Sequence, residues 1–218
     1  QKFKDKIIYI PVEDMPDGDN PYLRENFQRN CILRGLTNAE NNDLIIISDL
    51  DEIPNPKNFN KFHTKMRYAV FKQLHFYYKF NLQSQKNTHW YGSRICVKKY
   101  LKSPQWLRNL KFKKRPFWRI DKLRLNNILE NGGWHFCNLK NPNDLLYKYK
   151  NLCETNDPYN FNEKIDEKYL NINEIENRVK LGLDIIGRDE IYKVKKLNEE
   201  FPEYLLKNLT RYKDWLAN

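Results

Sequence analysis

The sequence has no long apolar run: none of its hydrophobic stretches approaches the roughly 20 residues that a helix needs to cross a lipid bilayer. It also lacks the glycine-rich phosphate-binding patterns of P-loop and dinucleotide-binding proteins, internal repeats and Gly/Ser-rich linkers. We therefore expect a single domain over residues 1–218, without a transmembrane segment.

Cysteine is scarce and widely spaced, with no CxxC pair, at Cys31, Cys96, Cys137 and Cys153. This spacing argues against a zinc ribbon and against a dense disulfide framework. We expect free, partly buried thiols, with one disulfide as the alternative. Free thiols in turn predict a reducing, cytoplasmic compartment.

Acidic residues are outnumbered: 39 Lys and Arg against 28 Asp and Glu give a formal net charge of +11. A basic surface attracts nucleic acids, acidic membrane surfaces and diphosphate-bearing substrates, and charge alone does not choose between them. A composition of 40% hydrophobic and 31% charged residues is typical of a soluble globular protein. The aromatic content of 14% is high, and such residues fill cores as well as sites for sugars or bases.

The apolar pattern predicts strands and helices in alternation. We expect a strand at residues 6–12 and a helix that starts at Asn20 and Pro21. We expect a second strand, buried on both faces, at residues 44–47. This order favours a βαβ unit with a parallel strand pair. Further strands are expected at residues 68–74, 76–81 and 90–97, and helices at residues 143–151, 172–183 and 202–215. We expect an α/β fold with a mostly parallel central sheet and a helical C-terminal portion.

The strongest chemical signal is the acidic group Asp49, Asp51 and Glu52, directly after the predicted buried strand. Like charges this close raise each other's pKa unless a cation or several donors compensate. Ligands of open α/β sheets bind beyond the carboxyl ends of the strands, and oxygen ligands there suit Mg²⁺ or Mn²⁺. Asp49 and Asp51 would point to the same side in regular strand geometry. A solvated acidic turn is the alternative interpretation.

A second candidate begins at two glycines, Gly132 and Gly133, which lead into Trp134 and His135. His135 would ligate a metal or donate to a phosphate, and Trp134 would stack on a sugar or base. The alternative is a glycine turn entering a strand, with Trp134 in the core and His135 bonded to a backbone carbonyl. No ligand-like spacing, and hence no role, is found for the other histidines, His63, His75 and His89.

These segments together resemble glycosyltransferase family 17. The match is carried, in the family's order, by residues 22–24 with 43–54, then 133–135, 182–188 and 202–208. The resemblance implies a GT-A-type fold and an inverting transferase that moves a sugar, GlcNAc from UDP-GlcNAc, onto a glycan hydroxyl with Mn²⁺ or Mg²⁺. The implied partners are therefore a UDP-sugar donor and a glycan or glycoconjugate acceptor.

The resemblance also implies roles for individual residues. Asp51 and His135 would contact the metal, and Asp49 would face the ribose or the donor sugar. An inverting reaction needs a general base for the acceptor hydroxyl. The remaining candidates are Arg24, Arg188 and Trp134 for donor binding and Glu52, Glu130 and Glu154 for the base.

The chain departs from the family pattern in two places. Many members have a His-x-Glu pattern where this chain has residues 153–156, with Glu154 beside Cys153. Members also have a strand and a helix before the equivalent of residues 2–4, and that strand helps to hold the nucleotide. We therefore expect a domain without this leading strand and helix.

Two other classes of protein compete with the transferase. Residues 111–119 interleave cations with aromatics, as in proteins that bind single-stranded nucleic acid, which favours a nucleic-acid-binding protein or a metal-dependent nuclease. No nucleic-acid-binding motif accompanies them, so nucleic acid is not the expected partner. A solvated face toward an anionic membrane or acidic glycan would explain the same stretch. A non-catalytic carbohydrate-binding domain is the third interpretation.

Overall fold

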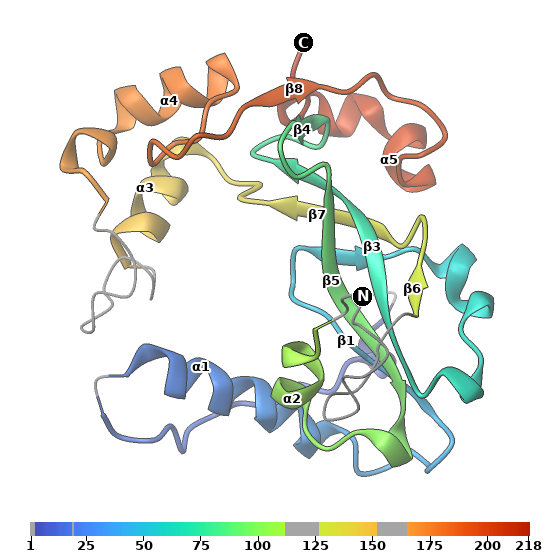
Figure 1. The fold of residues 1–218 in the computed structure, drawn as a ribbon. Helices are drawn as coiled ribbons and strands as arrows, with labels where there is room; N and C mark the ends of the chain where they lie inside the picture. Colours follow the sequence, from blue (N-terminus) through green and yellow to red (C-terminus); the bar gives the residue numbers. More distant parts are fainter. Residues whose placement is uncertain (1–2, 19, 112–126, 152–164) are drawn as a thin grey trace, which may run out of the picture. The chain divides into compact units, whose positions relative to one another are not determined.

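The computed structural model describes residues 3–18, 20–111, 127–151 and 165–218, which form a mixed α/β protein (Figure 1). The chain packs as two compact units. Unit 1 comprises the described residues within 1–47, 63–69 and 94–127, and unit 2 those within 48–62, 70–93 and 128–218. The single domain expected from the sequence stays a prediction.

Unit 1 contains a capped helix and an antiparallel strand pair. Helix α1 (Pro21–Asn30) begins where Asn20 Oδ1 accepts hydrogen bonds from the next turn, so the predicted start is confirmed. Strand β1 (Leu44–Ile47) is also confirmed, and it pairs antiparallel with the end of β5 (His89–Val97). Its predicted burial on both faces is wrong, because Ile45 and Ile47 are buried but Leu44 is exposed. Helix α2 (Pro104–Asn109) packs Leu107 and Trp106 against this pair.

The strand predicted at residues 6–12 is wrong. A short 3-10 helix covers Lys4–Lys6, and the residues that follow belong to no strand, with Ile7, Ile8 and Tyr9 exposed. No neighbouring strand satisfies their backbone groups, so the apolar run does not form part of a sheet. The predicted βαβ unit is therefore absent from the described part of unit 1.

Unit 2 is built on a mixed sheet in which β3 (Tyr68–Tyr77) is central, in the hydrogen-bonded order β5-β3-β4-β8 (Figure 1). Strands β4 (Leu82–Ser84) and β8 (Tyr192–Val194) pair antiparallel. Strand β7 (Gly133–Cys137) runs parallel to β3 and antiparallel to β2 (Glu52–Pro54), and β6 (Ile128–Leu129) is also parallel to β3.

The expectation of a mostly parallel sheet is therefore wrong, because most of the strand pairs are antiparallel. Parallel pairing needs a long crossover, and among the described strands it occurs where β3 pairs with β6 and β7, both far along the chain from β3. A tight turn instead joins β3 directly to β4. That turn starts at Tyr78, whose φ of 61° ends the strand that the sequence predicted at residues 76–81.

The helices of unit 2 largely match their predicted positions: α3 (Pro142–Asn151), α4 (Ile172–Leu181) and the short α5 (Glu203–Lys207). Helices α3 and α4 pack together, with Leu145, Tyr149 and Ile175 in one buried cluster (Figure 1). The 3-10 helices are Lys4–Lys6, Cys31–Gly35, Pro56–Lys61, Thr64–Met66, Lys98–Tyr100, Glu167–Tyr169 and Leu209–Trp215. Among the described residues, no helix combines the length and apolar character that spanning a membrane requires.

Strand β7 separates an apolar face from a polar face in unit 2. Alternate residues of a strand point to opposite sides. Trp134 and Phe136 accordingly join a buried cluster with Phe76, Phe201 and Leu205. His135 and Cys137 point to the other side, in register with His75 and Tyr77 of β3. This polar face carries the candidate active site.

Candidate active site

The acidic segment forms a tight turn between β1 and β2. Glu52 N donates to Asp49 O at 3.0 Å, and Ser48 Oγ donates to Glu52 O at 2.9 Å. Leu50 lies at the tip and is fully exposed, whereas Asp49 and Asp51 are half-buried. The turn therefore holds the two aspartates on either side of an exposed leucine.

Glu52 stabilises this turn through the hydrogen bonds of its side chain. Its carboxylate is buried and accepts hydrogen bonds from Trp90 Nε1 at 2.8 Å, Ser93 Oγ at 3.2 Å and Asp49 N at 3.2 Å. Gly92 leaves room for it, since a Cβ there would lie 2.6 Å from Glu52 Cδ. A buried carboxylate needs hydrogen-bond donors in place of water, and these three groups supply them. This geometry gives Glu52 a role in positioning the turn.

Asp51 meets His135 because β2 and β7 pair directly at this point. Glu52 lies opposite His135, and Phe136 N donates to Asp51 O at 2.9 Å. The Asp51 Oδ2 atom lies 3.4 Å from His135 Nε2. Burial acts to raise the pKa of Asp51, but the hydrogen bond and charge of His135 outweigh it and lower this pKa.

The entry of the chain into β7 depends on Gly133, which adopts a φ of 122°. A Cβ at this position would lie 2.0 Å from the carbonyl oxygen of Ile53 on β2. Only glycine permits both this conformation and this approach. The pairing that brings Asp51 to His135 therefore requires the second glycine of the sequence motif.

Cys137 completes a group of three potential metal ligands. One ligand atom each from Asp51, His135 and Cys137 lie within 4.8 Å of one another. No other group of this kind occurs in the part of the chain that the structure describes. Burial raises the pKa of the Cys137 thiol to about 12, and the charge of Asp51 adds to this effect. We call these residues the Asp51–His135–Cys137 cluster.

Aromatic rings enclose His135. The His75 ring stacks on it with centroids 4.8 Å apart, and the Trp90 ring lies 5.1 Å away. Burial and the charge of His135 lower the pKa of His75 to about 4. Within the described part of the chain, His75 Nε2 and His135 Nδ1 are buried without a hydrogen-bond partner. Such nitrogens are uncommon in folded proteins and mark a place where a water, an ion or a substrate group binds.

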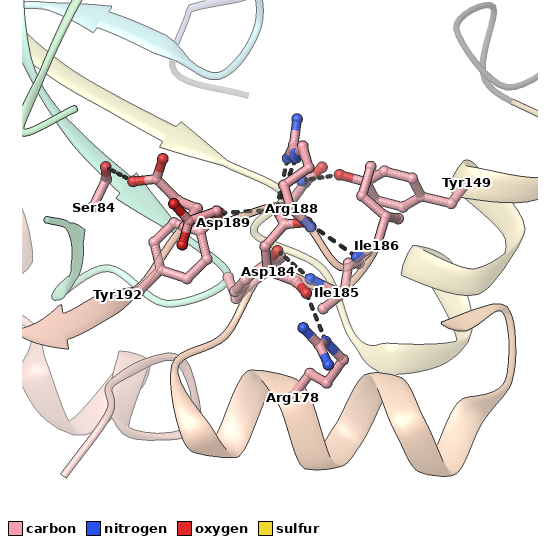
Figure 2. Close-up of polar contacts among 12 residues, drawn as sticks. Ser84, Tyr149, Arg178, Asp184, Ile185, Ile186, Arg188, Asp189 and Tyr192 are labelled. Atoms are coloured by element: carbon pink, nitrogen blue, oxygen red, sulfur yellow. Dashed lines mark hydrogen bonds and ion pairs between the residues drawn. The ribbon is translucent and has the colours of Figure 1, made fainter. Parts of the chain in front are cut away.

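Arg188 is held beside the cluster by a buried carboxylate. Asp184 is fully buried and accepts from Arg188 Nη2 at 2.7 Å, Arg188 Nε at 3.1 Å and Tyr192 Oη at 3.0 Å (Figure 2). Desolvation acts to lower the pKa of Arg188, but its hydrogen bond to Asp184 outweighs this and raises it. About half of the Arg188 side chain is exposed, and its charge acts to lower the pKa values of Cys137 and His75. A fixed, partly exposed guanidinium of this kind suits a phosphate group.

Lys148 of α3 contributes a second positive charge. Its Nζ donates to Asn138 Oδ1 at 2.7 Å, and its charge acts to lower the pKa values of Asp51 and Cys137. Asn138, buried just after β7 with a φ of 56°, also donates to Tyr149 Oη at 2.7 Å. Helix α3 and the end of β7 thus fix the lysine next to the cluster.

The remaining predicted residues lie elsewhere. Trp134 is buried on the apolar face of β7, donates from Nε1 to Glu200 O at 2.7 Å, and lines a pocket of about 390 Å³ on that side. Glu130 is exposed and forms an ion pair with Lys72 at 3.0 Å. Arg24 is exposed on α1 of unit 1. Glu154, as well as most of the basic stretch at residues 111–119, lies outside the described residues.

Several residues of the site were not predicted. Cys137 follows His135 by two residues, so strand alternation alone would have placed both on one face. His75 was assigned no role because its register with His135 depends on a distant strand pairing. Trp90 and Lys148 carry no local sequence signal.

Potential metal ligands beside two fixed cations, on the polar face of an α/β unit, are typical of an enzyme that binds an anionic substrate. The model of glycosyltransferase family 17 matches residues 1–216, and the chain belongs to this family. The protein is therefore a glycosyltransferase, which takes a sugar donor and a glycan acceptor, and the resemblance seen in the sequence is confirmed. Comparisons with curated proteins and with solved structures gave no significant match.

Proposed function

We propose that this glycosyltransferase moves GlcNAc from UDP-GlcNAc onto a glycan hydroxyl, with inversion, and depends on Mn²⁺ or Mg²⁺ held by Asp51 and His135. The carrying observation is the 3.4 Å approach of His135 Nε2 to Asp51 Oδ2. Family membership supports sugar transfer, and the family resemblance supports the donor and the inverting course.

The residues at this point fit a divalent cation. Two ligand atoms bound about 2.1 Å from one ion lie about 3.0 Å apart at a right angle and about 3.4 Å apart at the tetrahedral angle. The separation of 3.4 Å between Asp51 and His135 falls at the upper end of that range. The Asp51 carboxylate that faces His135 Nε2 is consistent with a shared ligand-binding role. A bound cation would neutralise charge on the departing diphosphate.

The chain's own cations would bind and orient the same diphosphate. Arg188 is fixed by Asp184 before any substrate arrives, so little ordering would be required on binding. Lys148 would add a second contact from α3. Asp49, at the other side of the turn from Asp51, would face the ribose or the donor sugar.

Glu52 is one of the three candidates for the general base. The Glu52 carboxylate already accepts from Trp90, Ser93 and the Asp49 amide, which supports a positioning role rather than proton transfer. Glu130 and Glu154 stay predictions for the base. Trp134 stays a prediction for donor binding, with its indole on the opposite face from His135.

Calorimetry of UDP-GlcNAc binding with and without Mn²⁺ tests the proposal. Asp51→Asn should abolish the metal-dependent part of the affinity. Asp189→Asn is the matched control, since that carboxylate is fully exposed in the same unit. Melting temperatures would show that both variants fold and that the donor stabilises only metal-competent protein. Equal metal-dependent affinity in Asp51→Asn and wild type would overturn the proposal.

A further inference from the structure

The position of Cys137 gives the cluster a chemistry beyond the two ligands just proposed. His135 and Cys137 are two residues apart on β7, so their side chains project from the same face. The residue between them, Phe136, donates its N–H to Asp51 O, which pins the aspartate against this stretch of strand. The three ligand atoms are consequently supplied by two directly paired segments.

The spacing of the cluster suits one ion bound by all three side chains. A thiolate binds such metals at about 2.3 Å and nitrogen or oxygen ligands at about 2.1 Å, so tetrahedral ligand atoms lie about 3.4–3.6 Å apart. The three atoms here lie within 4.8 Å of one another before any ion binds. Movements of about 1 Å, within the reach of a side-chain rotation, would bring them to bonding distance.

The surroundings of Cys137 match those of a ligand sulfur. Tyr77 is its register partner on β3 and lies directly beside it in the sheet. Outer contacts of this type orient metal ligands. The two neighbouring cations are each held by a hydrogen bond, Arg188 by Asp184 and Lys148 by Asn138.

We propose that Cys137 is the third protein ligand of the cation, and that its sulfur makes the site select transition-metal ions such as Co²⁺ and Zn²⁺ over Mg²⁺. Soft thiolate and imidazole ligands favour these ions, whereas Mg²⁺ is bound by oxygen. On binding, the metal–sulfur bond replaces the S–H bond, and the proton passes to solvent. The inference rests on the proposed metal binding by Asp51 and His135.

Cobalt absorption spectroscopy tests the sulfur ligand directly. Stoichiometric Co²⁺ should produce a near-ultraviolet sulfur-to-cobalt charge-transfer band in the wild-type protein. Cys137→Ser should lose the band, keep weaker Co²⁺ binding, and show a Co²⁺-to-Mg²⁺ affinity ratio at least roughly tenfold lower. Cys31→Ser makes the same chemical change at a cysteine in unit 1 and should keep both properties.

A second readout needs no variant. Calorimetry of Zn²⁺ binding at about pH 8, in buffers of different ionisation enthalpy, should show release of about one proton per ion, the proton of the thiol. Two outcomes would overturn the cysteine ligand but not the Asp51–His135 metal site. One is a charge-transfer band that persists in Cys137→Ser, and the other is metal binding by the wild type without the band and without proton release. Absence of any Co²⁺ or Zn²⁺ binding by the wild type would overturn the proposed metal site as well.

Discussion

Replacing Asp184 by asparagine should uncouple Arg188 from the fold. The substitution keeps the size of the side chain and an oxygen that accepts from the backbone N–H groups of Ile186 and Arg188, both at 3.1 Å. It removes the negative charge that receives Arg188 Nη2 at 2.7 Å and Tyr192 Oη at 3.0 Å. The perturbation is thus confined to the charge-assisted contacts drawn in Figure 2.

The size of the destabilisation depends on how deeply Asp184 and Arg188 are buried. Removing one partner of a buried ion pair costs about 3–5 kcal/mol. Asp184 is fully buried but about half of the Arg188 side chain is exposed, so water screens part of the loss. We expect about 2–3 kcal/mol, which for a chain of this size lowers the melting temperature by roughly 5–10 °C.

Thermal unfolding followed by donor titration measures both consequences. Asp184→Asn should melt earlier and bind UDP-GlcNAc more weakly, because the guanidinium would no longer be held in place. Asp189→Asn, five residues along the chain and fully exposed, should stay within about 0.5 kcal/mol of wild type. If both variants melt within about 2 °C of each other with equal donor affinity, the reasoning about Arg188 is refuted.

Three further predictions concern the turn, the strand and the enclosed histidine. In metal-free protein, the free energy of unfolding should fall by about 3 kcal/mol as the pH drops from about 6.5 to about 4. Over this range His75 binds a proton in the unfolded chain but stays neutral in the folded protein, where its pKa is lowered to about 4. His75→Gln should flatten that part of the urea-unfolding profile relative to exposed His63→Gln, and an unchanged slope would contradict the assignment. Gly133→Ala should cost at least about 2 kcal/mol. Gly18 has a φ of 117°, but a Cβ added there would have no atom within 4 Å. Gly18→Ala therefore measures the backbone strain alone and should destabilise the protein clearly less than Gly133→Ala. Glu52→Gln should destabilise the protein by about 1–3 kcal/mol and also weaken Mn²⁺ binding. A loss of activity with unchanged stability and unchanged Mn²⁺ affinity would instead support a catalytic role for the Glu52 carboxylate.

Local signals in the sequence predicted individual elements well. Asn20 before Pro21 marks the start of α1, because both its side chain and the following proline favour a helix N-terminus. The apolar residues 44–47 form a strand as expected. Their pairing was not predictable, because β1 joins β5 through contacts far apart in sequence. The assumption that a helix between two apolar runs implies a parallel pair failed, since residues 6–12 have no strand partner.

The site shows the same division between local and distant information. The acidic turn was identified from its composition, and Asp51 and His135 were joined only through the family resemblance. The contact itself depends on the pairing of β2 with β7. Lys148 and Arg188 come from α3 and from the loop before β8, so no spacing within one segment reveals that both act on Cys137. Only the folded chain brings these charges to the cluster.

A double-variant cycle on Mn²⁺ affinity tests most directly whether Asp51 and His135 hold one cation. Asp51→Asn, His135→Gln and the combined variant would each be titrated by calorimetry. If both side chains bind the same ion, the double variant should bind no more weakly than the worse single variant, because either loss already breaks the site. If instead the two losses simply add, or neither changes the affinity, Asp51 and His135 do not form a shared metal site.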